Sequence, residues 1–211
     1  MESIDNQWKK FLEEGDNLSF SLIYKKHIDE LFSYGISLGI PTEICKDALQ
    51  DTFYKLYITR EKLHHVENTT AYIFKTFKNC LINLYKKERH REKTVSFPNS
   101  FSIQVTVLDD IISNEKAELI KKKVESLLSK LTPNQREAVY LKYMIGLQHK
   151  EIAEVLNINE ESARKLLYRA MEKLREYASQ DNHPESLFLF TLLYLIRLKL
   201  FKSSFLIPLY L

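Results

Sequence analysis

The stretch His149–Tyr168 reads HKEIAEVLNINEESARKLLY and contains two helical patterns separated by a short turn. Apolar residues recur three or four positions apart in each pattern, which places them on one side of each helix. The residues expected to face inward are Ile152, Ala153 and Leu156 in the first helix, Ile158 in the turn, and Ala163, Leu166 and Leu167 in the second. This order of residues is typical of a helix-turn-helix, in which small Ala153 lets the second helix cross close by.

The outer side of the second helix is strongly basic. Between Ala163 and Arg175, five cations are opposed only by Glu172. A carboxylate at the helix start can accept a hydrogen bond from a cytosine amino group, Arg164 can pair with guanine, and the other cations can hold phosphates. The residues predicted to contact duplex DNA are Glu160, Glu161, Ser162, Arg164, Lys165, Tyr168 and Arg169. The alternative is a solvated helix pair in an ordinary bundle, which the ordered apolar set makes less attractive.

The residues before this motif extend the same helical domain. Thr132-Pro133 reads as an N-cap followed by the first helical residue, and Gly146 as the C-cap that ends that helix. A charged helix is predicted over residues 115–130, and Ala138, Val139, Leu141 and Tyr143 are expected to face inward. The C-terminal domain is therefore predicted to span residues 114–180.

A second domain is predicted over residues 1–93. Helical spacing runs from Phe20 to Tyr34, and Gly39-Ile40-Pro41 breaks it, with Thr42 as a candidate N-cap for the next helix. A third pattern follows from Thr70, with Thr69 or Thr70 as its cap. Residues 94–113 lose this periodicity and are predicted to be a linker, with a short edge strand as the weaker alternative. The fold expected is all-α, in two small helical domains.

These motifs resemble a known family. Leu131-Thr132-Pro133, Gln135-Arg136-Glu137, Gly146 and Lys150-Glu151-Ile152-Ala153 look like region 4 of bacterial RNA polymerase sigma factors of the extracytoplasmic-function (ECF) type. The resemblance implies that this domain binds the −35 promoter element and the flap of the polymerase β subunit. The turn reads Asn-Ile-Asn where the family frequently has Gly-Ile-Ser, so fine contacts can differ.

The block Asp47–Tyr57, DALQDTFYKLY, resembles the helix of sigma region 2 that docks on the β′ clamp of core polymerase. Carried over by position, the residues expected at that interface are Asp47, Gln50, Asp51, Phe53 and Leu56. Exposed polar groups beside an aromatic anchor would suit such a contact.

The block Ala71–Asn83, AYIFKTFKNCLIN, resembles the region 2 helix that reads and opens the −10 element. Aromatic faces stack unpaired bases and cations follow the backbone, so this mixture suits single-stranded DNA. The residues expected to contact it are Tyr72, Lys75, Lys78, Asn79, Asn83, Lys86 and Lys87. Lys78 stands where the family commonly has Arg, and Asn83 where it usually has Asp. The simpler interpretation makes the apolar residues core and the lysines a solvated face, and both can hold on opposite sides of one helix.

The function predicted is that of a sigma factor, which binds core RNA polymerase, recognises the −35 and −10 elements and helps to open DNA; an anti-sigma protein is a further expected partner. The alternative is a helix-turn-helix regulator that acts without core polymerase. We expect no enzyme, cofactor or metal, because the histidines lack metal spacing and the four glycines form no phosphate-binding loop. The net charge of +3 is too small to decide between DNA-binding classes.

The compartment expected is the cytoplasm. Cys45 and Cys80 form no CxxC pair, and the polar N-terminus has no apolar signal region. The C-terminal extension, residues 181–211, is different, because residues 187–196 are nearly all apolar before Arg197, Lys199 and Lys202 follow. Three hypotheses stay open for it: packing on the protein or on an anti-sigma partner, membrane-surface contact through residues 187–211, or no selected role. A bilayer span is disfavoured, because it needs about 20 apolar residues.

Overall fold

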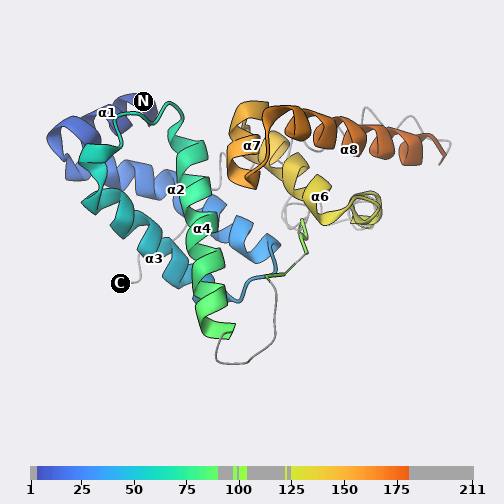
Figure 1. Ribbon diagram of the computed structural model, residues 1–211, viewed down its shortest axis with the longest axis horizontal. Helices are drawn as coiled ribbons and strands as arrows, with labels where there is room; N and C mark the ends of the chain where they lie inside the picture. Colours follow the sequence, from blue (N-terminus) through green and yellow to red (C-terminus); the bar gives the residue numbers. More distant parts are fainter. Residues whose placement is uncertain (1–3, 90–96, 99, 104–121, 123–124, 181–211) are drawn as a thin grey trace, which may run out of the picture. The chain divides into compact units, whose positions relative to one another are not determined.

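The computed structural model describes residues 4–89, 97–98, 100–103, 122 and 125–180, and this part of the chain is helical without strands (Figure 1). Contacts divide the chain into two compact units, Met1–Ser100 and Phe101–Leu211, called here the N-terminal and C-terminal units. The all-α prediction is confirmed. Of the expected helix over 115–130, the structure describes residues 122 and 125–130, which are helical at 122 and 125–129, and the extension 181–211 lies outside the described residues.

The N-terminal unit packs four α-helices around an aromatic core: α1 (Ile4–Glu14), α2 (Asn17–Ser37), α3 (Thr42–Ile58) and α4 (Thr69–Arg89), with the short turn η1 (Arg60–Lys62) after α3. Helix α4 packs against α3 and α2 (Figure 1). Helix α1 adds Trp8 and Phe11, and the Phe11 ring lies 4.9 Å from that of Phe20. No helix was predicted for the residues of α1, although Trp8, Phe11 and Leu12 have helical spacing.

The helix starts in this unit differ from two predictions. Helix α3 begins at Thr42 itself, with Pro41 as the cap residue and no side-chain cap bond, so the predicted Thr42 cap is wrong. Helix α4 begins at Thr69, and the Oδ1 of Asn68 accepts a hydrogen bond from the backbone N–H of Ala71 at 2.8 Å. Asn68 therefore caps α4 in place of either threonine, which fits the preference of asparagine for this position.

Gly35 allows α2 to approach the other helices closely. A Cβ at this position would lie 2.8 Å from Cys45 Sγ and 3.2 Å from the Phe77 ring, and both of those side chains are buried. Any larger residue would therefore have to push α3 and α4 away.

The C-terminal unit contains α6 (Pro133–Tyr140), the π-helix η4 (Leu141–Ile145), α7 (His149–Leu156) and α8 (Glu160–Gln180). A capping box opens α6 as predicted, with Thr132 and Gln135 exchanging side-chain and backbone hydrogen bonds. Gly146 ends η4 at φ 88°, the left-handed region that favours glycine. The π-helical turn was not predicted, and Tyr143 within it is only half-buried.

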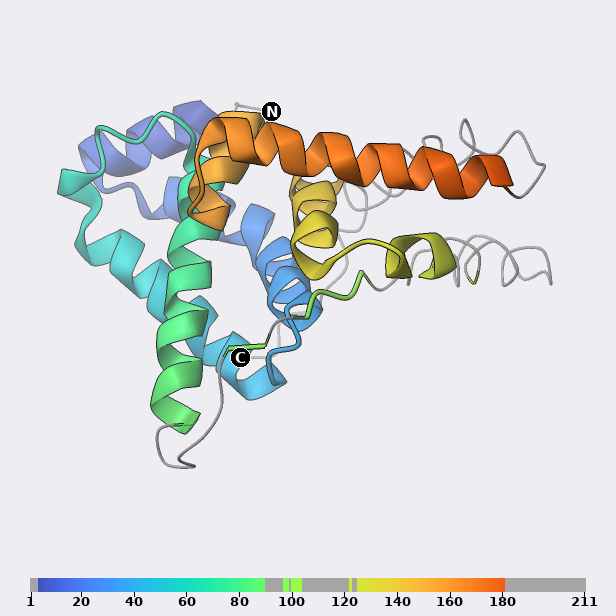
Figure 2. The same cartoon turned by 45° about the vertical axis from the view of Figure 1, so that its right-hand side comes forward.

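Helices α7 and α8 form the predicted helix-turn-helix, and Figure 2 shows α7 against the first turns of α8. Asn157 makes the turn at φ 55°, which asparagine tolerates better than most residues. Two details of the prediction are wrong. Ile158 is 39% exposed and does not fill the gap between the helices, and Val155 is buried where Leu156 and Leu166 are only half-buried.

Candidate nucleic-acid interface

Helix α8 is positioned by a cap at its start and an apolar stripe along one side. The backbone N–H of Ser162 donates to Asn159 Oδ1 at 2.7 Å, which satisfies one of the open N–H groups of the first turn. The buried side consists of Ala163, Leu167, Ala170, Met171 and Leu174. Because that side is fixed on the unit, the opposite side of α8 faces solvent.

The residues predicted to contact duplex DNA share this solvent-facing side. Glu160 is half-buried, and the exposed members are Glu161, Ser162, Arg164, Lys165, Tyr168 and Arg169. Tyr168, at 64% exposure, presents a large aromatic ring to solvent. The geometry therefore allows the six exposed members to meet one ligand, as insertion into a major groove requires.

Acids and cations on this face are paired along the helix. Arg164 binds Glu160 at 2.5 Å and Lys165 binds Glu161 at 2.6 Å, both in i,i+4 register. Exposed pairs of this kind are worth only about 0.3–0.5 kcal/mol. Replacing these ion pairs with contacts to phosphates or bases would therefore cost little free energy. In the free chain, the carboxylates partly neutralise the charges of Arg164 and Lys165.

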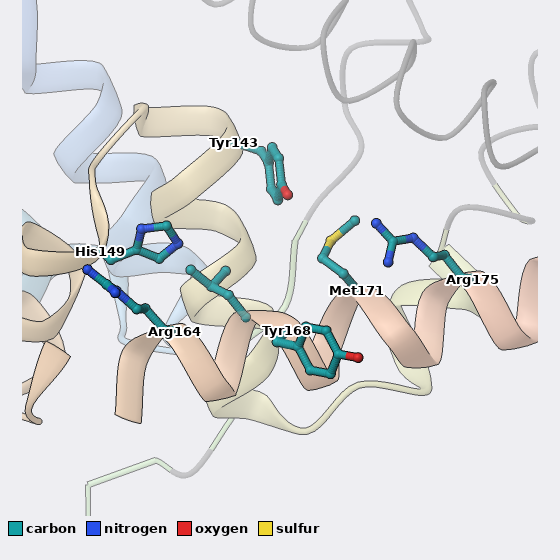
Figure 3. A pocket seen from close by; sticks show the side chains of 7 residues that line it. Tyr143, His149, Arg164, Tyr168, Met171 and Arg175 are labelled. Atoms are coloured by element: carbon teal, nitrogen blue, oxygen red, sulfur yellow. The ribbon is translucent and has the colours of Figure 1, made fainter. Parts of the chain in front are cut away.

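A hollow of about 600 Å³ lies beside this face. Figure 3 shows His149 and Arg164 at one end and Tyr143, Met171 and Arg175 toward the other, and Leu167 and Tyr168 complete the lining. Arg175 lies close enough to oppose, by its charge, the rise that burial gives to the pKa of Tyr143. The basic surface of α8 therefore extends past the predicted residues to Arg175, which the contact prediction did not include.

Helix α4 carries the second candidate face. At about 100° per residue, Tyr72, Lys75, Asn79, Asn83 and Lys86 form one stripe, opposite the buried Phe77 and Leu81. Asn79, Asn83, Lys86 and Lys87 are exposed, and Tyr72, Lys75 and Lys78 are half-buried. Lys78 and Lys87 lie on the flanks of the stripe. The core and the basic face thus occupy different sides of one helix, as the sequence suggested.

A buried histidine anchors the start of α4. His27 Nδ1 donates to the Ile23 carbonyl at 2.8 Å, which leaves Nε2 of the neutral ring to accept from the Thr70 hydroxyl at 3.1 Å. Burial lowers the pKa of His27 from 6.5 to about 4, so the ring is neutral at pH 7. This bond ties α2 to the turn that carries Tyr72.

The third candidate surface, on α3, differs from its prediction. Asp47, Gln50 and Asp51 are exposed on one face, whereas Phe53 and Leu56 are 4% and 1% exposed. Phe53 is core because its ring lies 4.7 Å from Tyr24 and 6.2 Å from Phe20, both on α2. In this structure, Phe53 and Leu56 hold α3 in place and offer no surface to a partner.

The two most exposed large apolar side chains of α3 are Tyr54, at 66%, and Ile58, at 58%. Both share the face of Asp47 and Gln50 by helical spacing. Sequence reasoning missed them because it transferred the family's apolar positions and did not ask which side of α3 the neighbouring helix α2 covers.

Among the described residues, no group of three His, Cys, Asp or Glu side chains is placed to hold a metal ion. Both cysteines are free thiols, and burial raises the pKa of Cys45 to about 11. Within the same described ranges, no helix is long and apolar enough to cross a membrane.

Comparisons with known proteins find sigma factors that are similar to this chain. Residues 121–174 match the family model described as Sigma-70, region 4. The matched residues include α6, α7 and most of α8. The ECF RNA polymerase sigma factor SigM of Bacillus subtilis (strain 168) is 25% identical over 163 residues, which is 72% of this chain and 91% of that protein. The RNA polymerase sigma factor CnrH of Cupriavidus metallidurans is also 25% identical, over 80% of this chain and 91% of that protein.

Two solved structures share the fold. One is CnrH in complex with the cytosolic domain of CnrY, with a TM-score of 0.54 at 22% identity over 85% of this chain and all of that one. The other is the sigma factor RpoE in complex with the anti-sigma factor NepR from Bartonella quintana, with a TM-score of 0.51 at 19% identity over 78% of this chain and 97% of that one. The resemblance stated from the motifs is confirmed.

Proposed function

We propose that this chain, a relative of the ECF sigma factors, binds core RNA polymerase and directs it to promoters, with α8 reading the −35 element and α4 engaging the −10 element. The observation that carries the proposal is the presence of two nucleic-acid faces of different chemistry on a chain similar to sigma factors over about nine-tenths of their length. The named relatives are sigma factors, which argues against a catalytic role for this chain.

The −35 assignment is supported by the solvent-facing side of α8. Arg164 has the planar guanidinium that pairs in two hydrogen bonds with guanine, and each such pair is worth about 1–3 kcal/mol of discrimination. Lys165 and Arg169 lie beside it and suit phosphates, which position the helix without reading sequence. Releasing the Glu160 and Glu161 carboxylates from their ion pairs also makes them available to cytosine amino groups.

The −10 assignment is supported by the stripe on α4. Half-buried Tyr72 and Lys75 have restricted side chains, which lowers the entropy lost when a base stacks or a phosphate binds. Asn79 and Asn83 follow at the next turns and can hydrogen-bond exposed base edges, and Lys86 extends the cationic track. This mixture fits an unpaired strand better than a closed duplex.

The contact with core polymerase is proposed for the exposed face of α3. Asp47 and Asp51 supply negative charge, and Tyr54 and Ile58 supply apolar area for a buried centre. We also propose that an anti-sigma protein restrains the chain, because both similar solved structures hold a sigma factor with such a protein or with CnrY.

The cytoplasm is the compartment in which this function would operate. Membrane-surface contact through residues 187–211 stays a hypothesis, which cell fractionation with and without residues 181–211 would test. A full-length protein found entirely in the soluble fraction would contradict it.

The function is tested by reconstitution. We expect the purified full chain to co-purify with core polymerase and to direct run-off transcripts with defined starts, and Tyr54→Ala to weaken the co-purification. Lys46→Ala, an exposed change on the same helix, is the matched control. Tight and specific binding to duplex DNA without core, combined with no transcript, would instead identify a plain helix-turn-helix regulator.

A further inference from the structure

Helix α2 has a second apolar side, opposite the side that it buries in the N-terminal unit. The buried side includes Ile23, His27, Leu31 and Tyr34. On the opposite side, six residues follow one another at intervals of four, three, four, three and four positions. At about 100° per residue, all six fall within about 40° of one line along the helix. They are Leu18, Leu22, Lys25, Asp29, Phe32 and Ile36, called here the α2 stripe.

The α2 stripe is accessible to solvent. Leu18 is 69% exposed and Leu22 is 39% exposed, although leucine is a residue that a fold usually buries. Lys25 is exposed as well, and the other three members are half-buried. Residues that repeat in steps of four and three form the seam along which two α-helices pack side by side. The stripe therefore combines the spacing of a helix-packing seam with an accessible surface.

Two charged residues stand in the middle of the stripe. Lys25 and Asp29 occupy positions that a helix-packing seam normally fills with apolar side chains. Neither forms an ion pair or a side-chain hydrogen bond with another residue that the structure describes. Burial raises the pKa of Asp29 above its ordinary value, because the carboxylate is partly desolvated. A cation placed beside Asp29 would therefore stabilise its charged form.

The α2 stripe is complementary to itself when two copies of the helix run antiparallel. A two-fold axis level with residue 27 places the first member of the stripe in one copy opposite the last member in the other, and so on inward. Because the axis relates the two copies, every such contact is formed twice. The layers are Leu18 with Ile36, Leu22 with Phe32, and Lys25 with Asp29.

The two charges determine both the orientation and the register of such a pair. In a parallel pair, Lys25 would meet Lys25 of the second copy and Asp29 would meet Asp29, and like charges in contact oppose association. An antiparallel pair shifted to the next layer would place each charge against an apolar side chain, where its desolvation is not compensated. Polar residues in a seam commonly fix its register in this way. The arrangement centred on residue 27 is thus the one that the charges favour.

We propose that the α2 stripe is a self-association surface, through which two copies of this chain form an antiparallel dimer held by apolar layers and two ion pairs between Lys25 and Asp29. The stripe is about 27 Å long, since its ends are 18 residues apart at about 1.5 Å per residue. A single seam of this length fits a reversible dimer at the small end of specific interfaces. The inference is independent of the proposed function, because neither DNA nor polymerase takes part in the contact.

Charge reversal tests the pairing. Sedimentation of the full chain over a range of concentrations should show an equilibrium between monomer and dimer. Lys25→Asp and Asp29→Lys should each raise the dissociation constant of the dimer by about tenfold or more, because like-charge contacts replace both ion pairs. The double variant, which exchanges the two charges, restores opposite signs in each layer. Its dissociation constant should return to within about threefold of that of the parent.

Mixing the two single variants separates pairing from folding. An equal mixture of Lys25→Asp and Asp29→Lys should form dimers at a concentration at which each variant alone is monomeric, which also shows that both are folded. Lys55→Asp, an exposed charge reversal on α3, is the matched control and should leave the dimer unchanged. A parent chain that stays monomeric at every concentration would overturn the proposal and leave the stripe to a helix of another protein. A dimer that neither charge reversal weakens would overturn it as well.

Disulfide cross-linking tests the orientation. Leu18→Cys and Ile36→Cys are made separately in a Cys80→Ser background, which removes the more accessible of the two native thiols. Because opposite ends of the stripe meet in an antiparallel dimer, the mixture of the two variants should cross-link about tenfold faster than either alone, in which the new thiols lie about 27 Å apart along the seam. Cross-linking of Leu18→Cys with itself that is as fast as in the mixture would overturn the antiparallel assignment.

Discussion

The two units separate their candidate binding surfaces from their cores to different degrees. In the C-terminal unit, six of the seven predicted contact residues on α8 are exposed and none belongs to the apolar core. In the N-terminal unit, Phe53 and Leu56 of α3 are core residues, and Tyr72, Lys75 and Lys78 of α4 are half-buried. Substitutions in the candidate DNA face of α8 should therefore change binding alone, whereas many substitutions in the N-terminal unit should change stability as well.

The largest effect is expected for Phe53→Ala. Removing this buried ring should lower the free energy of unfolding of the N-terminal unit by about 3–5 kcal/mol, because it leaves a cavity in the aromatic core. Trp8, the one tryptophan of the sequence, is buried in this unit, so its fluorescence during urea unfolding reports on that unit. The neighbouring Tyr54→Ala should change stability by less than about 0.5 kcal/mol. Comparable losses for both variants would remove the distinction between core and surface on α3.

Lowering the pH is expected to change the stability of the N-terminal unit through two groups on α2 that have opposite effects. His27, with its pKa lowered to about 4 by burial, stabilises the fold fully above pH 6.5 and loses about 2 kcal/mol as the pH falls to 4.5. Burial raises the pKa of Glu30 to about 7, so its charged form destabilises the fold above pH 4.5. As the pH falls from 7 to 4.5, Glu30 becomes protonated in the folded state and this destabilisation is lost. The two slopes should nearly cancel between pH 7 and 4.5.

Glu30→Gln separates these slopes. The variant should be about 2–3 kcal/mol more stable than the parent at pH 7 and should lose about 2 kcal/mol by pH 4.5, because only the His27 slope remains. Trp8 fluorescence in urea at each pH gives the values. A variant whose stability stays level across this range would show that His27 is not held neutral by burial.

In the C-terminal unit, Arg164→Ala should weaken binding of the holoenzyme to −35 duplex by about 1–3 kcal/mol, which is about fivefold to 150-fold. The thermal stability of the unit should stay within about 0.5 kcal/mol, because the lost ion pair with Glu160 is exposed. Glu172→Gln, an exposed change on the same helix, serves as the control. A large loss of stability in Arg164→Ala would place this face in the fold and not in the interface.

The smallest effect is expected for Glu160→Gln. Losing the partner of Arg164 should destabilise α8 by only about 0.3–0.5 kcal/mol and should raise affinity for nonspecific duplex a few-fold, with a steeper salt dependence. Titrations at two salt concentrations measure both. Unchanged affinity and salt slope would mean that the ion pair does not restrain Arg164 in the free chain.

The contrast between the two units also explains which features of the fold and of the candidate surfaces could be predicted from the sequence. Local signals were sufficient for the Thr132 capping box, the Gly146 C-cap and the two helices of the helix-turn-helix, because each depends on neighbouring residues. The burial of Phe53 was not predicted because it depends on Tyr24 and Phe20 of another helix. The burial of Phe101 depends likewise on Tyr140 and Arg136, which follow it by more than thirty residues.

The proposed roles of α4 at the −10 element and α8 at the −35 element are tested most directly by run-off transcription with core polymerase. The templates are a closed duplex promoter and the same promoter with a mismatched −10 region. We expect the double variant Lys78→Ala and Asn79→Ala to lose output on the duplex and to regain most of it on the opened template. Arg164→Ala should lose output on both templates when each carries the −35 element. Equal rescue of both variants by the opened template, or full output from both on the duplex, would contradict the separate roles proposed for α4 and α8.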